Sequence, residues 1–406
     1  METLFLAHRI PYPPDRGDKI RSWNILKHLG TLGRVHLACF ADDEADAAHL
    51  PALRRAMGGS LGEAHVEIRS TGRIAAGLRA LQTGRPVSLT AFDSARLRGF
   101  VDGLLARGGI DAIFVFSGQM AQFVPASPGA LFVMDFGDMD SAKFAEYAQK
   151  GGALRWVHAR EADKLFAFER ATAARADCSL FVSDAEAALF RHQAALPGAD
   201  IRSMQNGIDL DFYDPAAAFD RGEAGEGPLV AFTGQMDYRP NVEAVVGFAE
   251  EAMPLILERR PDARFAIVGR NPAPAVQRLA GRNGTVVTGS VADVRSWVAG
   301  ADVVVAPLRM ARGIQNKVLE AMAMARPVVA SPAAFEGIDA EPGRHLLVAD
   351  TPQEQAKAVL SLIADPARAD ALGAEARRRM ESHYRWEAKL APLADMLRLP
   401  RRKAAA

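Results

Sequence analysis

The chain has 406 residues, of which 49% are hydrophobic and 24% charged, enough for roughly two or three domains with their own cores. Its 49 basic side chains balance 49 acidic ones, which argues against nucleic acid as the main partner, because phosphate binding needs a basic excess. Two cysteines in apolar runs, Cys39 and Cys178, make a disulfide framework implausible.

Targeting signals are weak along this sequence. The apolar run 4–7 is too short for a signal-peptide core, and no apolar run reaches the ~18 residues of a membrane span, so we expect a soluble cytoplasmic protein. Four basic residues crowd the C-terminus at 398–403. They fit a solvated end, and an anionic membrane surface is the alternative.

In the first half, short apolar or β-branched runs alternate with longer amphipathic stretches. Strands are predicted at 3–7, 34–40, 65–69, 111–116, 131–134 and 179–182. Helices are predicted at 19–29, 91–105 and 155–176. Near-continuous apolar strands separated by helices favour a parallel sheet buried on both faces.

The same alternation restarts in the second half. Strands are predicted at 228–233, 264–268, 285–288, 302–306, 327–330 and 345–348, with helices at 242–259 and 317–324. A proline, small residues and a glycine- and glutamate-rich run make 215–227 a linker. We therefore expect two α/β domains with doubly wound parallel sheets, 1–214 and 228–383, facing a cleft, with ligands beyond the carboxyl ends of the strands.

The first loop that could carry chemistry is 8–21, which contains three prolines and turns into a helix at Gly17. Such a helix start suits a phosphate or a polar substrate group, and Arg16, Asp18 and Arg21 lie around it. An ordinary proline-rich turn capped by Asp18 is the alternative. Neither G-x-G-x-x-G nor a Walker loop follows the first strand, which counts against a dehydrogenase or a P-loop enzyme.

Three carboxylates follow the strand at 131–134: Asp135, Asp138 and Asp140. Their spacing fits no calcium loop, so we expect no metal, and helix capping by Asp138 or Asp140 explains much of the cluster. Asp135, at the end of the strand, is the best candidate to face the cleft and hydrogen-bond a sugar hydroxyl. Further on, the turn dipeptide at Asn206-Gly207 marks a domain junction.

Segment 302–329 reads as strand, loop, helix and strand, and is the most informative. Gly313 opens the helix, and Lys317 and Glu320 share one helix face by their spacing. An anion at this helix start would have Lys317 for its charge and Glu320 for neighbouring hydroxyls, which suits a nucleoside diphosphate. The alternative is a surface Lys–Glu pair on an amphipathic helix.

Together these segments resemble the retaining glycosyltransferases of family 4, whose fold, GT-B, has two Rossmann-like domains. Within these enzymes, the chain more closely resembles the branch of sugar transferases found with exopolysaccharide and exosortase (PEP-CTERM) loci. The resemblance rests on the loop with Gly17, on 206–209 with Phe212 and Pro215, on 234–241, and on 313–323 with 326–329. It implies that 384–406 forms a C-terminal helix and tail that cross back to the N-terminal domain.

By this resemblance Glu320 is the second glutamate of an E-x7-E motif and holds the donor's ribose, while Arg312 stands at the first. Gln235 replaces the arginine expected after the first strand of the donor domain, and Pro240 or Asn241 stands near the expected lysine. Lys317 is then the first choice of cation for the leaving diphosphate, with Arg309 among those behind it. The expected donor-binding residues are Gly234, Arg239, Arg270, Arg312, Gly313, Ile314, Gln315, Asn316, Lys317 and Glu320.

The resemblance implies a metal-independent hexosyltransferase that needs no cofactor. Its donor would be a nucleoside-diphosphate sugar, and its acceptor a glycan or a polyprenyl-linked glycan at the inner face of the membrane. Lys317, Glu320 and Asp135 are the expected catalytic residues, and Arg16, Gly17, Asp18 and Arg21 form the acceptor-side loop. The alternatives are a GT-B sugar-nucleotide epimerase and a catalytically inactive binding protein, the latter suggested by Arg312 and Gln235.

Overall fold

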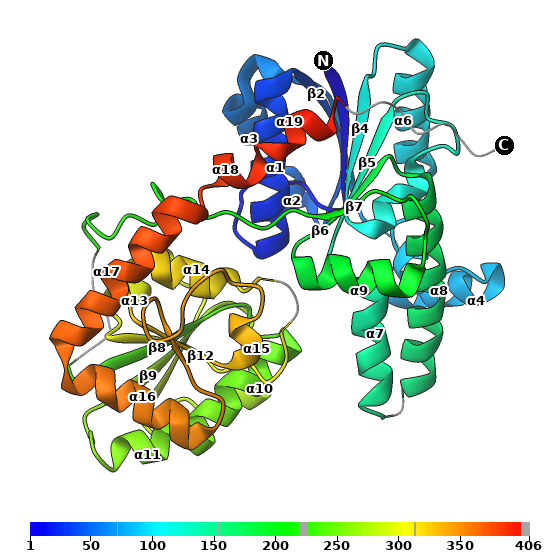
Figure 1. The fold of residues 1–406 in the computed structure, drawn as a ribbon. Coiled ribbons are helices and arrows are strands. Elements are labelled where there is room, and N and C mark those ends of the chain that lie inside the picture. The colour runs from blue at the N-terminus through cyan, green and yellow to red at the C-terminus, as the bar shows by residue number, and fades with distance from the viewer. Residues whose placement is uncertain (71, 153, 220–225, 312–313, 399–406) are drawn as a thin grey trace. The chain divides into compact units, whose positions relative to one another are not determined.

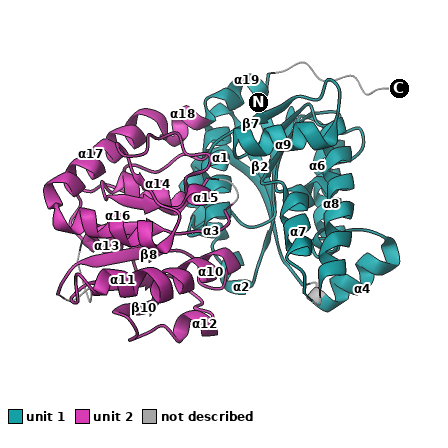
Figure 2. Cartoon of the chain, turned by 60° about the horizontal axis from the view of Figure 1, so that its bottom comes forward, with its two compact units in different colours: residues 1–205, 390–406 teal, residues 206–389 magenta. Residues whose placement is uncertain are grey.

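The computed structural model describes residues 1–70, 72–152, 154–219, 226–311 and 314–398, and the chain divides into two compact units (Figures 1 and 2). Unit 1 comprises Met1–Gln205 and Leu390–Ala406, and unit 2 comprises Asn206–Lys389. Each unit contains one sheet, and the strand pairs in both sheets are parallel. The expected fold class, two Rossmann-like α/β domains, is confirmed.

Unit 1 has a seven-stranded sheet in the order β3-β2-β1-β4-β5-β6-β7. Its strands are β1 Glu2–Ala7, β2 Arg34–Ala41, β3 Leu61–Ile68, β4 Ala112–Phe116, β5 Leu131–Gly137, β6 Cys178–Phe181 and β7 Ile201–Ser203. The central strand β4 is buried at every position, which explains its unbroken apolar run. Strand β7 was not expected, because three residues are too few to show a period.

Helices cover both faces of this sheet, with α1 and α3 on one side and α6 and α8 on the other (Figure 1). The α-helices of unit 1 are α1 Gly17–Leu32, α2 Glu44–Ala47, α3 Leu50–Met57, α4 Arg73–Thr83, α5 Val87–Thr90, α6 Ala95–Arg107, α7 Asp140–Gln149, α8 Arg155–Arg175, α9 Asp184–Ala194 and α19 Pro392–Met396. Two 3₁₀ turns, Gly58–Ser60 and Gly118–Phe123, complete it.

Unit 2 has a six-stranded sheet in the order β10-β9-β8-β11-β12-β13. Its strands are β8 Leu229–Thr233, β9 Arg264–Val268, β10 Thr285–Gly289, β11 Val303–Ala306, β12 Val328–Ala330 and β13 Leu347–Val348. Its α-helices are α10 Arg239–Gly247, α11 Met253–Leu257, α12 Pro274–Gln277, α13 Val294–Gly300, α14 Asn316–Ala323, α15 Pro332–Phe335, α16 Pro352–Ala364, α17 Pro366–His383 and α18 Trp386–Leu390.

The single helix expected at 242–259 is interrupted. Helix α10 ends at Gly247, and a π-helical turn, Phe248–Ala252, connects it to α11. Pro254 lies just after this turn and has no N–H to donate to the preceding turn. A π-turn next to a proline lets the chain continue in the same direction without that hydrogen bond.

The segment from Asn206 to Tyr213, which the sequence led us to assign to the N-terminal domain, belongs to unit 2. Its N–H at Ile208 donates to the carbonyl of Tyr384 at 2.6 Å, and Ile208 forms a parallel bridge with Arg385. A Cβ at Gly207 would lie 2.6 Å from the Cα of Trp386, so glycine is required by close approach. The hydrogen bonds and apolar burial of this segment place the unit boundary at 205/206, nine residues before the expected 214.

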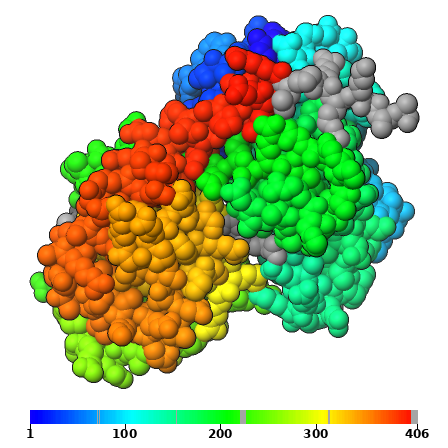
Figure 3. All heavy atoms as spheres, in the orientation of Figure 1, coloured from blue at the N-terminus to red at the C-terminus, as the bar shows by residue number. Residues whose placement is uncertain are grey.

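After residue 389 the chain returns to unit 1, where α19 lies beside the N-terminal elements (Figures 2 and 3). Leu393 and Met396 bury its apolar side. The expected boundary was 384, but α18 up to Lys389 belongs to unit 2. None of the helices in the described ranges combines the length and the apolar character that a membrane span requires.

Candidate functional site

In unit 2 the backbone comes unusually close together at the carboxyl ends of β8 and β9. The N–H of Gly234 donates to the carbonyl of Val268 at 3.0 Å, and a Cβ at Gly269 would lie 1.6 Å from the Gly234 oxygen. A Cβ at Gly234 would lie 3.3 Å from Nζ of Lys317. Glycine at these two positions therefore lets bare backbone, rather than a side chain, lie next to the lysine, as phosphate sites require.

Lys317 lies in the first turn of α14, which follows β11, the neighbour of β8 in the sheet. Its Nζ donates to Oδ1 of Asn241 at 2.6 Å and lies 4.3 Å from the ring centroid of Phe232. The Nδ2 of Asn241 donates in turn to the carbonyl of Gln235 at 2.9 Å. Burial lowers the pKa of Lys317 to about 7, against the attraction of Glu320.

Asn241 was noted in the sequence only as the residue near a missing lysine. In the fold, the amide at this position holds the ammonium group of Lys317 instead. Helix α14 thus supplies the charged side chain, and Asn241 on helix α10 orients it. No spacing in the sequence could have paired two residues 76 positions apart.

Glu320 lies one turn further along α14 and accepts a hydrogen bond from the hydroxyl of Tyr213. Burial raises the pKa of Glu320, while this hydrogen bond and the charge of Lys317 lower it. The pKa of Tyr213 is raised well above its usual value by burial and by the charge of Glu320, so it stays a donor. Tyr213 was missed because it lies in the turn that sequence reasoning assigned to a domain junction.

The other expected donor residues around the start of α14 are placed as follows. Ile314 is buried, and Gln315 is the N-cap residue of the helix. Asn316 accepts through Oδ1 a hydrogen bond from Nδ2 of Asn206 at 3.1 Å, which ties the turn at the unit boundary to the helix start. Two expected donor residues lie outside the described residues: Arg312 and Gly313.

The other described arginines that the sequence suggested for the leaving diphosphate contact neighbouring groups in unit 2. Arg239 is exposed and donates to Glu243 at 2.7 Å, and Arg309 is exposed and donates to Glu251 at 2.6 Å. Arg270 is partly buried after β9, and its carbonyl accepts from the N–H of Met236. Of the cations named from the sequence, Lys317 is the one that the described contacts bring to Gly234.

In unit 1, Asp135 does not present the open carboxylate expected from the sequence. It is 0% exposed and accepts two hydrogen bonds from Arg21, at 2.9 Å from Nε and 3.1 Å from Nη2. It also accepts from the N–H of Gly137 at 3.0 Å. The carboxylate therefore fixes Arg21 and the end of β5, which corrects its expected role as a ligand of a sugar hydroxyl.

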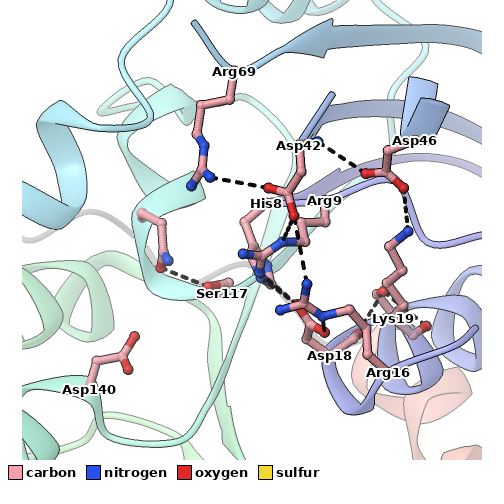
Figure 4. A network of polar contacts seen from close by, with 12 residues as sticks. His8, Arg9, Arg16, Asp18, Lys19, Asp42, Asp46, Arg69, Ser117 and Asp140 are labelled. Atoms are coloured by element: carbon pink, nitrogen blue, oxygen red, sulfur yellow. Dashed lines mark hydrogen bonds and ion pairs between the residues drawn. The ribbon is translucent and has the colours of Figure 1, made fainter. Parts of the chain in front are cut away.

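A polar network surrounds the start of α1, where the sequence predicted an acceptor-side loop (Figure 4). Asp18 accepts from Arg9 and Arg16, both at 2.7 Å, and lies 3.1 Å from Nε2 of His8. Burial by itself would raise the pKa of Asp18, but the contact with His8 and the charges of Arg16 and Arg9 lower it below its usual range. Asp18 therefore serves as a fixed anion that orders the cations around it.

The same network includes residues that follow β2 and β3. Asp42 accepts from Nε of Arg9 at 2.8 Å and lies 3.3 Å from Nη2 of Arg69 and 3.7 Å from Nη1 of Arg16. Three arginines thus surround two aspartates at one edge of the sheet, where the carboxyl ends of β1, β2 and β3 meet. This excess of positive charge suits an anionic ligand group.

Two further features of this edge point to a ligand. Ser117, at the end of β4, has φ of 78°, a conformation that costs a non-glycine residue about 1–3 kcal/mol and recurs at functional sites. The Nδ1 of His8 is buried and, within the described part of the chain, has no hydrogen-bond partner. Sequence reasoning placed His8 and Arg9 in the loop 8–21 without giving them a role. It missed Asp42, Arg69 and Ser117, because only the sheet order brings them to this loop.

The carboxylates after β5 do not cap α7, whose N-cap residue is Met139. Asp140 is the first residue of that helix and lies 3.3 Å from Nζ of Lys143. Burial, with the charges of Glu186 and Asp140, raises the pKa of Asp138 to about 6. Within the described ranges, no group of three or more His, Cys, Asp and Glu side chains is placed to hold a metal ion.

Residues 227–365 match the family model of the glycosyl transferases group 1. The phosphatidyl-myo-inositol mannosyltransferase of Mycobacterium tuberculosis is 34% identical over 176 residues, 42% of this chain and 45% of that protein. A GDP-mannose-dependent α-(1-6)-phosphatidylinositol monomannoside mannosyltransferase of the same species is 31% identical over 222 residues, 50% of this chain and 57% of that protein. The chain thus matches about half the length of these curated relatives.

Solved structures resemble the fold over almost the whole chain. Sucrose-phosphate synthase of Thermosynechococcus elongatus has a TM-score of 0.71 at 19% identity and 98% coverage of both chains. Anabaena HepE in complex with UDP and glucose has a TM-score of 0.71 at 17% identity, covering 98% of this chain and 100% of that one. The family match covers residues 227–365 of this chain, and the solved structures show that its two-sheet fold is of the GT-B type over almost the whole length.

Proposed function

We propose that this protein is a retaining, metal-independent glycosyltransferase that moves a hexose from a nucleoside-diphosphate sugar to a polyprenyl-linked or free glycan in exopolysaccharide biosynthesis. One observation carries the proposal. Asn241 holds Nζ of Lys317 beside the bare backbone of Gly234, one helical turn before Glu320. This is a cation, a helix start and a carboxylate in the order that a nucleoside diphosphate needs.

The leaving group is the part of the reaction that these residues would stabilise. Breaking a glycosyl–phosphate bond builds negative charge on the diphosphate and cationic character on the sugar. The first N–H groups of α14 and the ammonium group of Lys317 would stabilise that negative charge without reorganising. Because burial lowers the pKa of Lys317 to about 7 in the free protein, the incoming diphosphate would also favour its protonated form.

Glu320 would bind the ribose hydroxyls of the donor. Its carboxylate already accepts one hydrogen bond from Tyr213, which fixes its orientation and leaves further lone pairs for two hydroxyl donors. A carboxylate held by a buried phenol loses little freedom when the sugar binds. Tyr213 would thus act as a positioning residue for Glu320.

The acceptor side is assigned to the network around Asp18 and Asp42 in unit 1. Its three arginines exceed its two aspartates in charge, which matches a diphosphate such as the one that links a glycan to a polyprenyl chain. The cytoplasmic face of the membrane would then be where the enzyme meets this acceptor.

The first donor to test is GDP-mannose, because the mannosyltransferases similar to this chain include GDP-mannose-dependent enzymes. UDP-glucose is the second, because the similar fold of HepE was solved with UDP-glucose. The proposal does not depend on which base is bound, since the contacts described here concern the diphosphate and the ribose.

Thermal unfolding with UDP, GDP, ADP or NAD tests the donor site. A ligand at 100 times its Kd adds about 2.7 kcal/mol of stability, which shifts the transition visibly. We expect a shift with one nucleoside diphosphate in wild type and in Lys357→Met, an exposed lysine of α16, and its loss in Lys317→Met and Glu320→Gln. If Lys317→Met and Glu320→Gln both show the same thermal shifts with each nucleotide as wild type, the proposed donor site is refuted.

Product analysis distinguishes the alternatives. With the bound donor and a polyprenyl-diphosphate glycan, transfer with the donor's anomeric configuration, unchanged by EDTA, would support the proposal. Conversion of the donor sugar without acceptor would favour an epimerase. Nucleotide binding with no product from either assay would favour an inactive binding protein.

A further inference from the structure

Arg377, on helix α17, contacts both segments that carry the Tyr213–Glu320 pair. Its Nη1 donates to the carbonyl of Tyr213 at 2.7 Å and to the carbonyl of Ala323, the last residue of α14, at 2.8 Å. Nη1 and Nη2 also donate to the carbonyl of Leu210, at 3.4 and 3.3 Å. One guanidinium thus bonds both the turn that ends at Tyr213 and the helix that carries Glu320.

The turn at 209–213 depends on this outside donor. These residues lie outside any strand or helix, so their carbonyls are not satisfied by a regular ladder. Leu210 and Tyr213 are nonetheless buried, and a buried carbonyl without a donor costs free energy comparable to a lost hydrogen bond. Arg377 supplies the donor from 164 residues further along the chain. The carbonyls that fix the place of Tyr213 are therefore satisfied by a side chain of another element.

Helix α17 lies close enough to α14 to hold this arginine in place. The two helices pack against each other in unit 2 (Figure 1). A Cβ at Gly373, one turn before Arg377, would lie 2.1 Å from the carbonyl oxygen of Ala325, so the backbone of α17 directly contacts the turn after α14. One turn later, Glu381 accepts from Nε of Arg377 at 2.7 Å. The guanidinium is thus oriented by its own helix, and both Nη groups remain for the carbonyls.

From these contacts we propose that Arg377 is a positioning residue for the ribose of the donor, acting through Tyr213 and Glu320. The inference rests on the proposed function, in which Glu320 binds the ribose hydroxyls. By fixing the carbonyl of Tyr213 and the C-terminal end of α14, Arg377 brings the phenol hydroxyl to the Glu320 carboxylate. Lys317 lies in the first turn of α14, at the other end of the helix. Arg377 should therefore affect the ribose end of the ligand and not its diphosphate end.

Calorimetric titration with two probes separates these ends. GDP or UDP carries both a ribose and a diphosphate, whereas inorganic pyrophosphate carries no ribose. Arg377→Met should weaken binding of the nucleoside diphosphate about tenfold and binding of pyrophosphate less than about twofold. An equal loss with both probes would overturn the proposal, because it would show that the whole of α14 is displaced. Unchanged nucleotide affinity would overturn it as well.

A double-mutant cycle tests whether Arg377 acts through Tyr213. In a Tyr213→Phe background the bond to Glu320 is already absent, so adding Arg377→Met should change nucleotide affinity less than about twofold. A further loss of about tenfold in that background would overturn the proposal, since the arginine would then act by another route.

Fluorine NMR of the full chain labelled with fluorotyrosine tests the positioning without any ligand. The chain has five tyrosines, so the resonance of Tyr213 can be assigned as the one that Tyr213→Phe removes. We expect this resonance to move in Arg377→Met. It should stay in place in Arg378→Met, the same change at the neighbouring exposed arginine, which pairs with Glu375. An unchanged Tyr213 resonance in Arg377→Met would overturn the proposal.

Arg377→Lys keeps the proposal testable if the methionine variant does not fold. An ammonium group keeps the charge but lacks the fork that reaches several carbonyls at once. We expect a shifted Tyr213 resonance and a nucleotide affinity between those of wild type and Tyr213→Phe, and wild-type values of both would overturn the proposal. If wild type binds no nucleoside diphosphate, the donor site of the proposed function is refuted, whereas the Tyr213 resonance still confirms or overturns the positioning by Arg377.

Discussion

Replacing Asp135 by asparagine removes the negative charge that Arg21 faces inside unit 1. The carboxylate accepts two bonds from the guanidinium, at 2.9 and 3.1 Å, and one from the N–H of Gly137 at 3.0 Å. An asparagine side chain keeps one oxygen and turns an NH₂ group toward a guanidinium that can only donate. The variant therefore loses the charge and one good acceptor at the same time.

The magnitude follows from the burial of the pair. Asp135 is 0% exposed and Arg21 is 3% exposed, so water cannot replace the missing partner. Removing one member of a buried ion pair costs about 3–5 kcal/mol, a large share of the roughly 5–15 kcal/mol that stabilises a typical domain. With a urea m-value of about 2 kcal/mol/M, the unfolding midpoint should fall by about 1.5–2.5 M.

Urea unfolding, followed by circular dichroism and by tryptophan fluorescence, to which the buried Trp23 of α1 contributes, measures this loss. The matched control is Glu243→Gln, which breaks an exposed pair with Arg239 of similar length, 2.7 Å, and should cost less than about 1 kcal/mol. Replacing both members, as Arg21→Met with Asp135→Leu, should restore most of the stability that Asp135→Asn loses.

A result within about 1 kcal/mol of wild type for Asp135→Asn, as for the exposed control, would refute this reasoning. A second result would also contradict the structural role of Asp135, namely loss of sugar transfer in Asp135→Asn at unchanged stability. It would return Asp135 to the substrate-facing role that its position at the end of a strand suggested.

Three further predictions concern unit 2. Because burial lowers the pKa of Lys317 to about 7, this side chain is mostly neutral at pH 8 in the protein without ligand. Binding of a nucleoside diphosphate should then take up about one proton. Its affinity should fall roughly tenfold per pH unit from pH 7.5 to 9. Calorimetry in buffers of different ionisation enthalpy measures the uptake, and an unchanged uptake in Lys317→Met would contradict it. Tyr213→Phe should weaken nucleotide binding about tenfold while the thermal transition persists, because Glu320 loses its buried hydrogen-bond donor. Calorimetric titration measures the affinity, and an unchanged affinity would exclude the positioning role of Tyr213. Gly269→Ala should abolish nucleotide binding or destabilise unit 2 by more than about 3 kcal/mol, because its Cβ would lie 1.6 Å from the Gly234 oxygen. If the variant keeps both the stability and the nucleotide affinity of wild type, this backbone contact is dispensable.

The sequence alone determined the fold class, because its signal is local. Each strand expected from an apolar run is present in the two parallel sheets, and the helix expected at 317–324 is α14 at Asn316–Ala323. Lys317 and Glu320 could also be placed on one face from spacing, since three residues along an α-helix fix their relative direction. These features depend on residues within one element.

The tertiary structure decided everything that depends on partners far apart in the chain. Only the fold shows that Lys317 contacts Asn241 and that Glu320 contacts Tyr213. It also pairs Asp135 with Arg21, 114 residues away in the chain, and places arginines around Asp42. It also moved the unit boundary to 205/206, because Ile208 pairs with Tyr384 and Arg385. The order of the strands in each sheet sets these contacts, and strand order leaves no period or spacing in the sequence, so a polar residue's partner is read from the fold.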